Sequence, residues 1–122
     1  MVMRGIRGAI TVEIDQPELV LEATRELLQA ILCENPGLSN KDIASAFFTV
    51  TDDIISVHPA LAARQIGWGL VPMICSQEIP VPGSLPLCIR VLIHWNTDCE
   101  QAAVHHVYLR GAVNLRPDLL KS

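Results

Sequence analysis

The chain has 122 residues, of which 9 are Lys or Arg and 13 are Asp or Glu, so its formal charge is −4. This length suits one domain over residues 1–122, the acidic balance excludes the basic surface of a typical nucleic-acid binder, and no leader or long apolar run predicts a membrane segment. Half of the residues are hydrophobic but only 4 % are aromatic, which predicts an aliphatic core and an apolar surface that meets another subunit.

An N-terminal strand is predicted over residues 2–12. Hydrophobic side chains recur at every second position and share one face, with Arg4 near its edge. The opposite face carries Arg7 between two small residues, Gly5 and Ala9. The small neighbours leave space beside the Arg7 guanidinium.

One long helix is predicted to follow, beginning near Pro17 and ending near Glu34. Proline suits the first helical turn, and aliphatic residues then recur at helical spacing. The sequence Asn-Pro-Gly at residues 35–37 ends the helix. Ser39 with Asp42 resembles a capping box, which predicts a short helical turn.

The remaining elements are short and separated by turn residues. A helix is predicted over residues 59–66, between a proline and Gly67. Strands are predicted at residues 46–51, 71–77, 87–95 and 104–110. The prolines between residues 80 and 86 predict a loop there. Together these elements predict an α+β fold, in which a mixed sheet is covered by one long helix and short helices.

Arg90 is the most informative single residue, because it lies in the middle of the most hydrophobic strand. A buried guanidinium requires a carboxylate or an anionic ligand. The alternatives are an internal ion pair with Glu78 or Glu100, or a position at an exposed edge of the sheet. All but two of the basic residues are arginines, and arginine suits a bidentate grip on carboxylates. Arg90 and Arg7 on separate strands therefore predict a site for a compact dianion.

Three further residues are candidates for contact with a ligand. The Tyr108 hydroxyl can reach a ligand carboxylate, although a half-exposed tyrosine on a sheet is the common alternative. Glu78 begins the proline-rich loop, where functional carboxylates often occur, and otherwise is a solvated glutamate. Cys75 has no histidine base close in sequence, which favours a small buried hydrophobe over a nucleophile, and a thiol hydrogen bond inside a pocket stays open.

No metal and no cofactor are expected. His105 and His106 are adjacent and point to opposite faces of the predicted strand, so they cannot chelate one ion together. His58 and His94 have no acidic partner at the spacing of metal ligands. The four cysteines form no CxxC pair, which predicts reduced thiols in a cytoplasmic protein. A glycine-rich phosphate loop is also missing.

Four motifs in chain order resemble the small homotrimeric α/β class of chorismate mutase, and not the all-helical class. They are RGIRGAITVE, VPMICSQE, CIRV and HVYLRGAVNLRPDL, and the likeness runs from about residue 4 to residue 118. The resemblance implies a trimeric pseudo-α/β barrel with active sites between neighbouring subunits. It also implies the conversion of chorismate to prephenate, in phenylalanine and tyrosine biosynthesis, without a cofactor.

The resemblance also implies roles for individual residues. Arg7 and Tyr108 would hold the substrate's carboxylates, and Arg90 would bridge a carboxylate and the ether oxygen. Glu78, with Cys75 beside it, would face the ring and its hydroxyl. The rest of the pocket would comprise His58, Ala60 and Arg64 of the adjacent subunit, Met73 and Ile74 of the VPMI run, and Leu115 and Arg116 of the tail.

The chain departs from the family pattern at the rim of this pocket. An aromatic residue often stands where the chain has His58, and a basic residue where it has Leu61, which puts the electrostatic closure of the rim in doubt. Two rival interpretations stay open. A non-catalytic trimer that binds small carboxylates needs only the two arginines, and a structural oligomer would use them in ion pairs between subunits.

Overall fold

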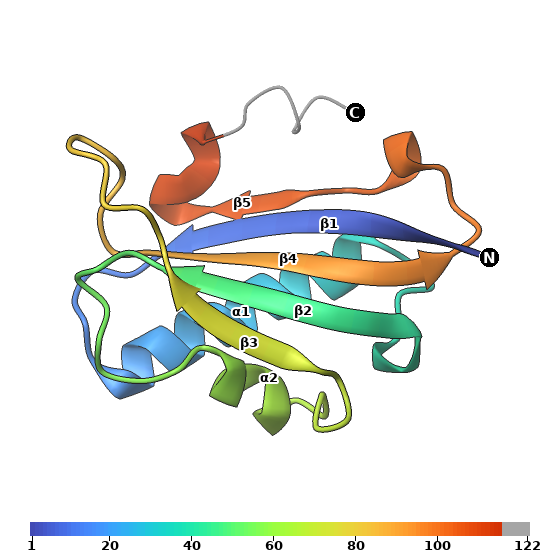
Figure 1. Cartoon of the computed structure of the whole chain (residues 1–122), viewed down its shortest axis with the longest axis horizontal. Helices are drawn as coiled ribbons and strands as arrows, with labels where there is room; N and C mark the ends of the chain where they lie inside the picture. The colour runs from blue at the N-terminus through green and yellow to red at the C-terminus, as the bar shows by residue number, and fades with distance from the viewer. Residues whose placement is uncertain (116–122) are drawn as a thin grey trace.

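A five-stranded mixed sheet organises the chain in the computed structural model, which describes residues 1–115 (Figure 1). The strands are β1 (Val2–Thr11), β2 (Ile43–Val50), β3 (Met73–Gln77), β4 (Cys88–Thr97) and β5 (Val107–Leu109), in the spatial order β3-β2-β4-β1-β5. The central strand β4 runs antiparallel to β1 and β2, whereas the outer strands β3 and β5 run parallel to their neighbours.

The helices gather on one face of this sheet, with α1 crossing behind it in Figure 1. They are α1 (Pro17–Glu34) and α2 (Ala60–Gln65), and three 3-10 turns cover Asn40–Asp42, Gln101–Ala103 and Arg110–Asn114. Pro17 occupies the first turn of α1, as the sequence predicts. The predicted α+β fold, a mixed sheet covered by one long helix and a short one, is confirmed.

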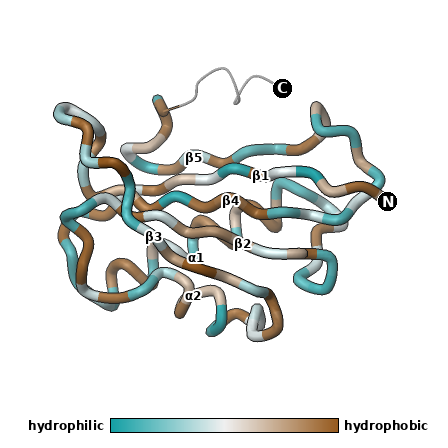
Figure 2. The backbone as a smooth tube through the Cα atoms, viewed as in Figure 1, coloured by the Kyte–Doolittle hydropathy of each residue, from teal (hydrophilic) through white to brown (hydrophobic). Residues whose placement is uncertain are grey.

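The core between the sheet and α1 is mainly aliphatic, as predicted. Ile10 of β1, Ile31 of α1 and Ile93 of β4 are all fully buried, and each such side chain contributes about 1.5–3 kcal/mol to folding. Hydrophobic residues accordingly run along β4 in the middle of the sheet (Figure 2). Gly8 permits the close approach of α1, because a Cβ there would lie 2.8 Å from the Ile31 Cδ1 atom.

The last predicted strand is shorter than expected. Residues 104–110 were predicted as one strand, but β5 comprises only Val107–Leu109. The His105 N–H donates to the Asn35 Oδ1 at 2.9 Å, so the chain is tied to the end of α1 before β5 begins. At the other end Arg110 adopts φ +53° and turns away towards α1, where it pairs with Glu26. Arg110 therefore does not share a strand face with Tyr108.

Two other element boundaries differ for local reasons. β2 begins at Ile43, earlier than predicted, directly after the short 3-10 turn. β3 begins at Met73 rather than Val71, because Pro72 has no N–H to donate. In the turn before β2, the Ser39 hydroxyl accepts from the Lys41 N–H and not from the third turn residue, so the capping box is incomplete.

Candidate active site

A cleft of about 450 Å³ lies on the face of the sheet opposite the helices. Side chains along β2 alternate between the buried core and the cleft: Phe48 packs in the core, whereas Phe47 and Thr49 line the cleft. The cleft brings together Arg7 of β1, Arg90 of β4, Tyr108 of β5 and Glu78, which directly follows β3. Four of the predicted site residues therefore meet although they come from distant parts of the sequence.

Strand register explains why these side chains converge. Across the sheet, Thr49 of β2 lies opposite Arg90 of β4, and Arg90 lies opposite Ala9 of β1. Ala9 in turn lies opposite Tyr108 of β5. These four residues form one row, in which the small Ala9 leaves space between the guanidinium and the phenol. Arg7 lies two residues before Ala9, and thus on the same face of β1.

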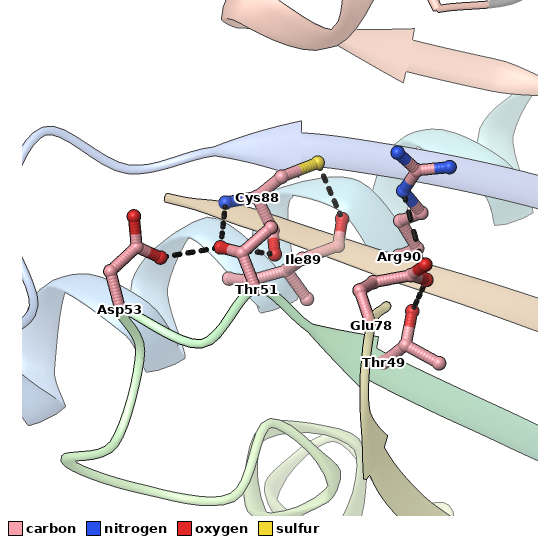
Figure 3. A network of polar contacts seen from close by, with 7 residues as sticks. All are labelled: Thr49, Thr51, Asp53, Glu78, Cys88, Ile89 and Arg90. Carbon is pink, nitrogen blue, oxygen red and sulfur yellow. Dashed lines mark hydrogen bonds and ion pairs between the residues drawn. The ribbon is translucent and has the colours of Figure 1, made fainter. Parts of the chain in front are cut away.

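Arg90 is held near a carboxylate but is not closely paired with it (Figure 3). The Arg90 Nε lies 3.8 Å from the Glu78 Oε2, and their side chains are 31 % and 29 % exposed. Among the described residues, this buried Nε makes no hydrogen bond. An ion pair of this length and exposure contributes at most about 1 kcal/mol. The guanidinium therefore stays available to an anionic ligand.

The alternatives for Arg90 can now be separated. The internal partner is Glu78, at ion-pair distance, whereas Glu100 lies 3.7 Å from Arg4. An exposed sheet edge is wrong, because β4 is the central strand.

The Thr49 hydroxyl orients the Glu78 carboxylate by donating a hydrogen bond to its Oε2 atom. The Glu78 N–H also donates to the Val50 carbonyl oxygen at 2.8 Å, so β2 holds both the backbone and the side chain of this glutamate. Thr49 and Phe47 line the cleft and were missed from the sequence. The alternation along β2 predicts their shared face, but only the strand order places that face beside Arg90.

A polar network fixes the start of β4, two residues before Arg90 (Figure 3). The Thr51 Oγ1 accepts from the Cys88 N–H at 2.9 Å and donates to the Asp53 Oδ1 at 2.5 Å. The Asp53 carboxylate accepts from the Leu87 N–H at 3.0 Å. Leu87 has φ +51°, a conformation that costs free energy in a non-glycine residue and is stabilised here by that carboxylate.

The Cys88 thiol beside Arg90 is a buried, protonated group. Its side chain is fully buried, and burial raises the pKa of the Cys88 thiol despite the opposing effect of the Arg90 charge. A raised pKa disfavours the thiolate, which is the nucleophilic form. Cys88 therefore packs the floor of the site with Ala9 and Tyr108.

His106 is a third residue whose part in the site sequence reasoning missed. The Arg7 N–H donates to the His106 Nδ1 at 2.9 Å, just before β5 pairs with β1. This bond requires an unprotonated Nδ1 and fixes the backbone that carries Arg7. The doublet of His105 and His106 predicts only opposite faces of a strand, whereas the structure places both before β5.

Within one chain, Cys75 is not among the residues that line the cleft with Glu78. In the β2–β3 register Cys75 is opposite the buried Phe48, and it packs against the core on the helix side of the sheet. It lines a separate cleft of about 300 Å³, together with His58. Within one chain, β3 therefore separates Cys75 from Arg90.

The other predicted pocket residues that the structure describes are not among those lining the cleft of one chain. Ala60 and Arg64 belong to α2, where Ala60 is buried and Arg64 is exposed. Met73 packs against the core, while Ile74 is 62 % exposed. Leu115 packs beside Tyr108 and Cys88 at the margin of the cleft, and Arg116 lies outside the described residues.

Residues 1–115 contain neither a cluster of potential metal ligands nor a membrane-spanning helix. No three His, Cys, Asp or Glu side chains of this part form a group that could hold a metal ion. No helix in it is long and apolar enough to cross a bilayer.

The chain is similar to known proteins over almost its whole length. The type I chorismate mutase family matches residues 3–119. A chorismate mutase, AroH, of Thermus thermophilus is 59 % identical over 96 % of this chain and 96 % of its own. AroH of Bacillus subtilis is 45 % identical over 98 % of this chain and 94 % of its own. A solved chorismate mutase structure from Clostridium thermocellum superposes with a TM-score of 0.86 at 45 % identity, and covers 88 % of this chain and 96 % of its own.

These likenesses agree with the arrangement of the cleft, in which two arginines, a tyrosine and a carboxylate face the same space. They also agree with the motifs at both ends of the chain and on β4. The chain belongs to the type I chorismate mutase family.

Proposed function

We propose that the chain converts chorismate to prephenate, a step towards phenylalanine and tyrosine, at a site that includes this cleft. The observation that carries the proposal is the convergence of Arg7, Arg90, Tyr108 and Glu78 on one face of the sheet. Two guanidinium groups suit a substrate with two carboxylates. Family membership supports the same reaction.

The reaction requires positioning rather than covalent chemistry. A C–O bond breaks as a C–C bond forms within one molecule, with no nucleophile and no proton transfer. The substrate must first adopt a compact, chair-like conformer. Arg7 and Tyr108 hold its carboxylates in that conformer, which removes rotational entropy before the bonds rearrange.

Arg90 supplies the largest electrostatic contribution. Negative charge develops on the ether oxygen as the C–O bond breaks, and a fixed guanidinium stabilises it without reorganising. Glu78 offsets the positive character that develops on the ring. A millionfold acceleration requires about 8 kcal/mol, whereas one charge-assisted contact contributes about 1.5–3 kcal/mol. Several of these residues must therefore act together.

The complete site is shared between subunits of a homotrimer. The residues that resemble the family's pocket lie in two clefts on opposite sides of β3: Arg90 lines one cleft, and Cys75 with His58 lines the other. A second copy can present its second cleft to the first cleft of its neighbour. Ile74 and Ile79, exposed at and after the edge strand β3, support such an interface.

A cytoplasmic location is part of the proposal. All four cysteines are free thiols in the structure, as expected in a reducing compartment.

The test is a turnover assay on the purified chain with chorismate. We expect saturable loss of chorismate absorbance and the appearance of prephenate in the NMR spectrum. A folded protein that binds chorismate without consuming it would instead be a carboxylate-binding protein, and one that neither binds nor consumes it would be a structural oligomer. Either result would overturn the proposed function.

A further inference from the structure

The Thr49 hydroxyl shares an acceptor with Arg90. The Thr49 Oγ1 donates to the Glu78 Oε2, and the same oxygen lies 3.8 Å from the Arg90 Nε. The hydroxyl is within hydrogen-bond distance of this oxygen and the guanidinium is not (Figure 3). The carboxylate therefore sits between two competing donors and is bonded to the neutral one.

The position of the Arg90 Nε is unusual for this reason. A buried N–H without an acceptor is uncommon in folded proteins, yet this atom has none among residues 1–115 although a carboxylate is close by. A charge-assisted bond would place the two atoms about 2.8 Å apart. The Glu78 side chain has rotatable bonds enough to close that gap unless another contact restrains it.

Thr49 is placed to provide that restraint. It lies opposite Arg90 in the β2–β4 register, and its side chain points into the cleft. The Val50 carbonyl oxygen holds the Glu78 backbone, so β2 restrains the glutamate at two points. Without the Thr49 hydroxyl, β2 would restrain Glu78 through its backbone alone, and the carboxylate would be free to turn towards Arg90.

We propose that Thr49 is a positioning residue, whose hydroxyl holds Glu78 away from Arg90 so that the guanidinium keeps an unpaired N–H for the substrate. This inference rests on the proposed function, because the substrate of that reaction is the ligand that the Arg90 Nε–H would bind. When the hydroxyl is removed, Glu78 closes onto Arg90 and the resulting ion pair neutralises the group that meets the ether oxygen.

The variant Thr49→Val tests this role with little change of shape, since both side chains are β-branched. We expect kcat to fall by about tenfold or more, and Thr49→Ser, which keeps the hydroxyl, to stay within about threefold of the wild type. Thr97→Val is the matched control. Its hydroxyl accepts from the Cys99 N–H at the far end of β4, so this variant should keep the wild-type kcat.

A double-mutant cycle separates this role from a structural one. If Thr49 acts through the charge of Glu78, adding Thr49→Val to Glu78→Gln should change kcat by less than about twofold. A purely structural contribution of Thr49 would lower kcat by the same factor in both backgrounds, and that result would overturn the inference.

A second measurement does not depend on turnover. In ¹⁵N-labelled protein, the Arg90 Nε–H resonance, assigned by its loss in Arg90→Lys, should move downfield and exchange more slowly in Thr49→Val, as the new bond to Glu78 forms. An unchanged resonance would refute the positioning role whatever happens to kcat. If the wild type does not convert chorismate but the resonance still moves, the proposed function fails and the positioning of Glu78 by Thr49 stands.

Discussion

Arg90 is an arginine in the central strand of the sheet, where a hydrophobic residue would stabilise the fold more. Its Nε is buried without a hydrogen bond among the described residues, and such a donor costs about 1–3 kcal/mol. The nearby Glu78 offsets this cost only weakly at 3.8 Å. An arginine whose buried Nε lacks a hydrogen bond destabilises the fold but can bind a ligand, which is typical of active sites.

Replacing Arg90 tests its part in the reaction. We expect Arg90→Ala to lower kcat/KM by about a thousandfold, equivalent to about 4 kcal/mol of transition-state stabilisation. Arg90→Lys should be nearly as impaired, because an ammonium cannot reproduce the planar fork. Thermal unfolding of both variants should occur at or above the wild-type temperature, since a costly buried group is removed.

The matched control is Arg25→Ala, which removes an arginine of α1 that donates to the Gln65 Oε1 outside the cleft. It should keep the wild-type kcat/KM. Near-normal turnover of folded Arg90→Ala would remove Arg90 from the mechanism.

At the scale of elements, two connections on the helix side are tied together by Asp15. This carboxylate, between β1 and α1, accepts from the Ile55 N–H at 3.0 Å and from the Ser56 hydroxyl at 2.6 Å. The hydrogen bond from the Ser56 hydroxyl, followed by that from the Ile55 N–H, lowers the pKa of Asp15. The segment so held continues directly into His58 and the start of α2. Asp15 therefore orders the chain beside the second cleft.

The lowered pKa sets the sign of a pH dependence. Because the folded state binds the proton of Asp15 less tightly than the unfolded chain, the ionised carboxylate stabilises the fold above its ordinary pKa, and this stability is lost as the pH falls through the lower, folded value. We expect Asp15→Asn to cost about 1 kcal/mol at pH 7, allowing for solvent screening. The difference should shrink below about pH 4.

Urea unfolding at pH 7 and at pH 3, at equal protein concentration, measures the free energy of unfolding of the wild type and of Asp15→Asn. Asp52→Asn, at an exposed aspartate in the connection between β2 and α2, is the control and should change the stability at neither pH. A difference that stays constant between the two pH values would show that the charge of Asp15 does not contribute.

At the scale of the whole molecule, the helices cover one face of the sheet (Figure 1). The opposite face carries the cleft lined by Arg7 and Arg90. Leu92 on that face is 38 % exposed, and Ile79 after β3 is 79 % exposed. Exposed apolar side chains on an uncovered sheet face and after an edge strand favour association with another copy. The second cleft, around Cys75, opens on the other side of the same strand.

Mixing two inactive variants tests whether each site uses two subunits. Arg90→Ala removes the arginine of the first cleft. Arg64→Ala removes the arginine that we expect the neighbouring subunit to contribute to the same site. In trimers reassembled from equal amounts of both chains, about a quarter of the sites should contain two unaltered halves and regain activity.

Sedimentation and native mass spectrometry give the assembly state of these mixtures, and a trimer should have three times the 13.4 kDa mass of one chain. Mixed trimers without recovered turnover would place both arginines in the same subunit's site. A monomer with full activity would rule out a shared site.

The sequence alone determined the features that depend on neighbours along the chain. The boundaries of α1 follow from Pro17 and from the sequence at residues 35–37, and the core faces of β1 and β4 follow from hydrophobic residues at alternate positions. The same alternation indicated Arg90 as an anomaly on its strand. Boundaries were wrong where distant groups intervened, as at β5, where Asn35 holds the chain at His105.

Only the tertiary structure decided which side chains share the cleft. The row of Thr49, Arg90, Ala9 and Tyr108 depends on strand order and on register. Ala9 and Tyr108, for example, pair although they are 99 positions apart in the sequence. No local sequence pattern encodes strand order or register. The side of β3 on which Cys75 lies could not be predicted, because hydrophobic and polar residues do not alternate along this short strand and a shift of one residue reverses every side chain. The sequence specifies the residue types directly, but which side chains come into contact depends on pairing between distant strands.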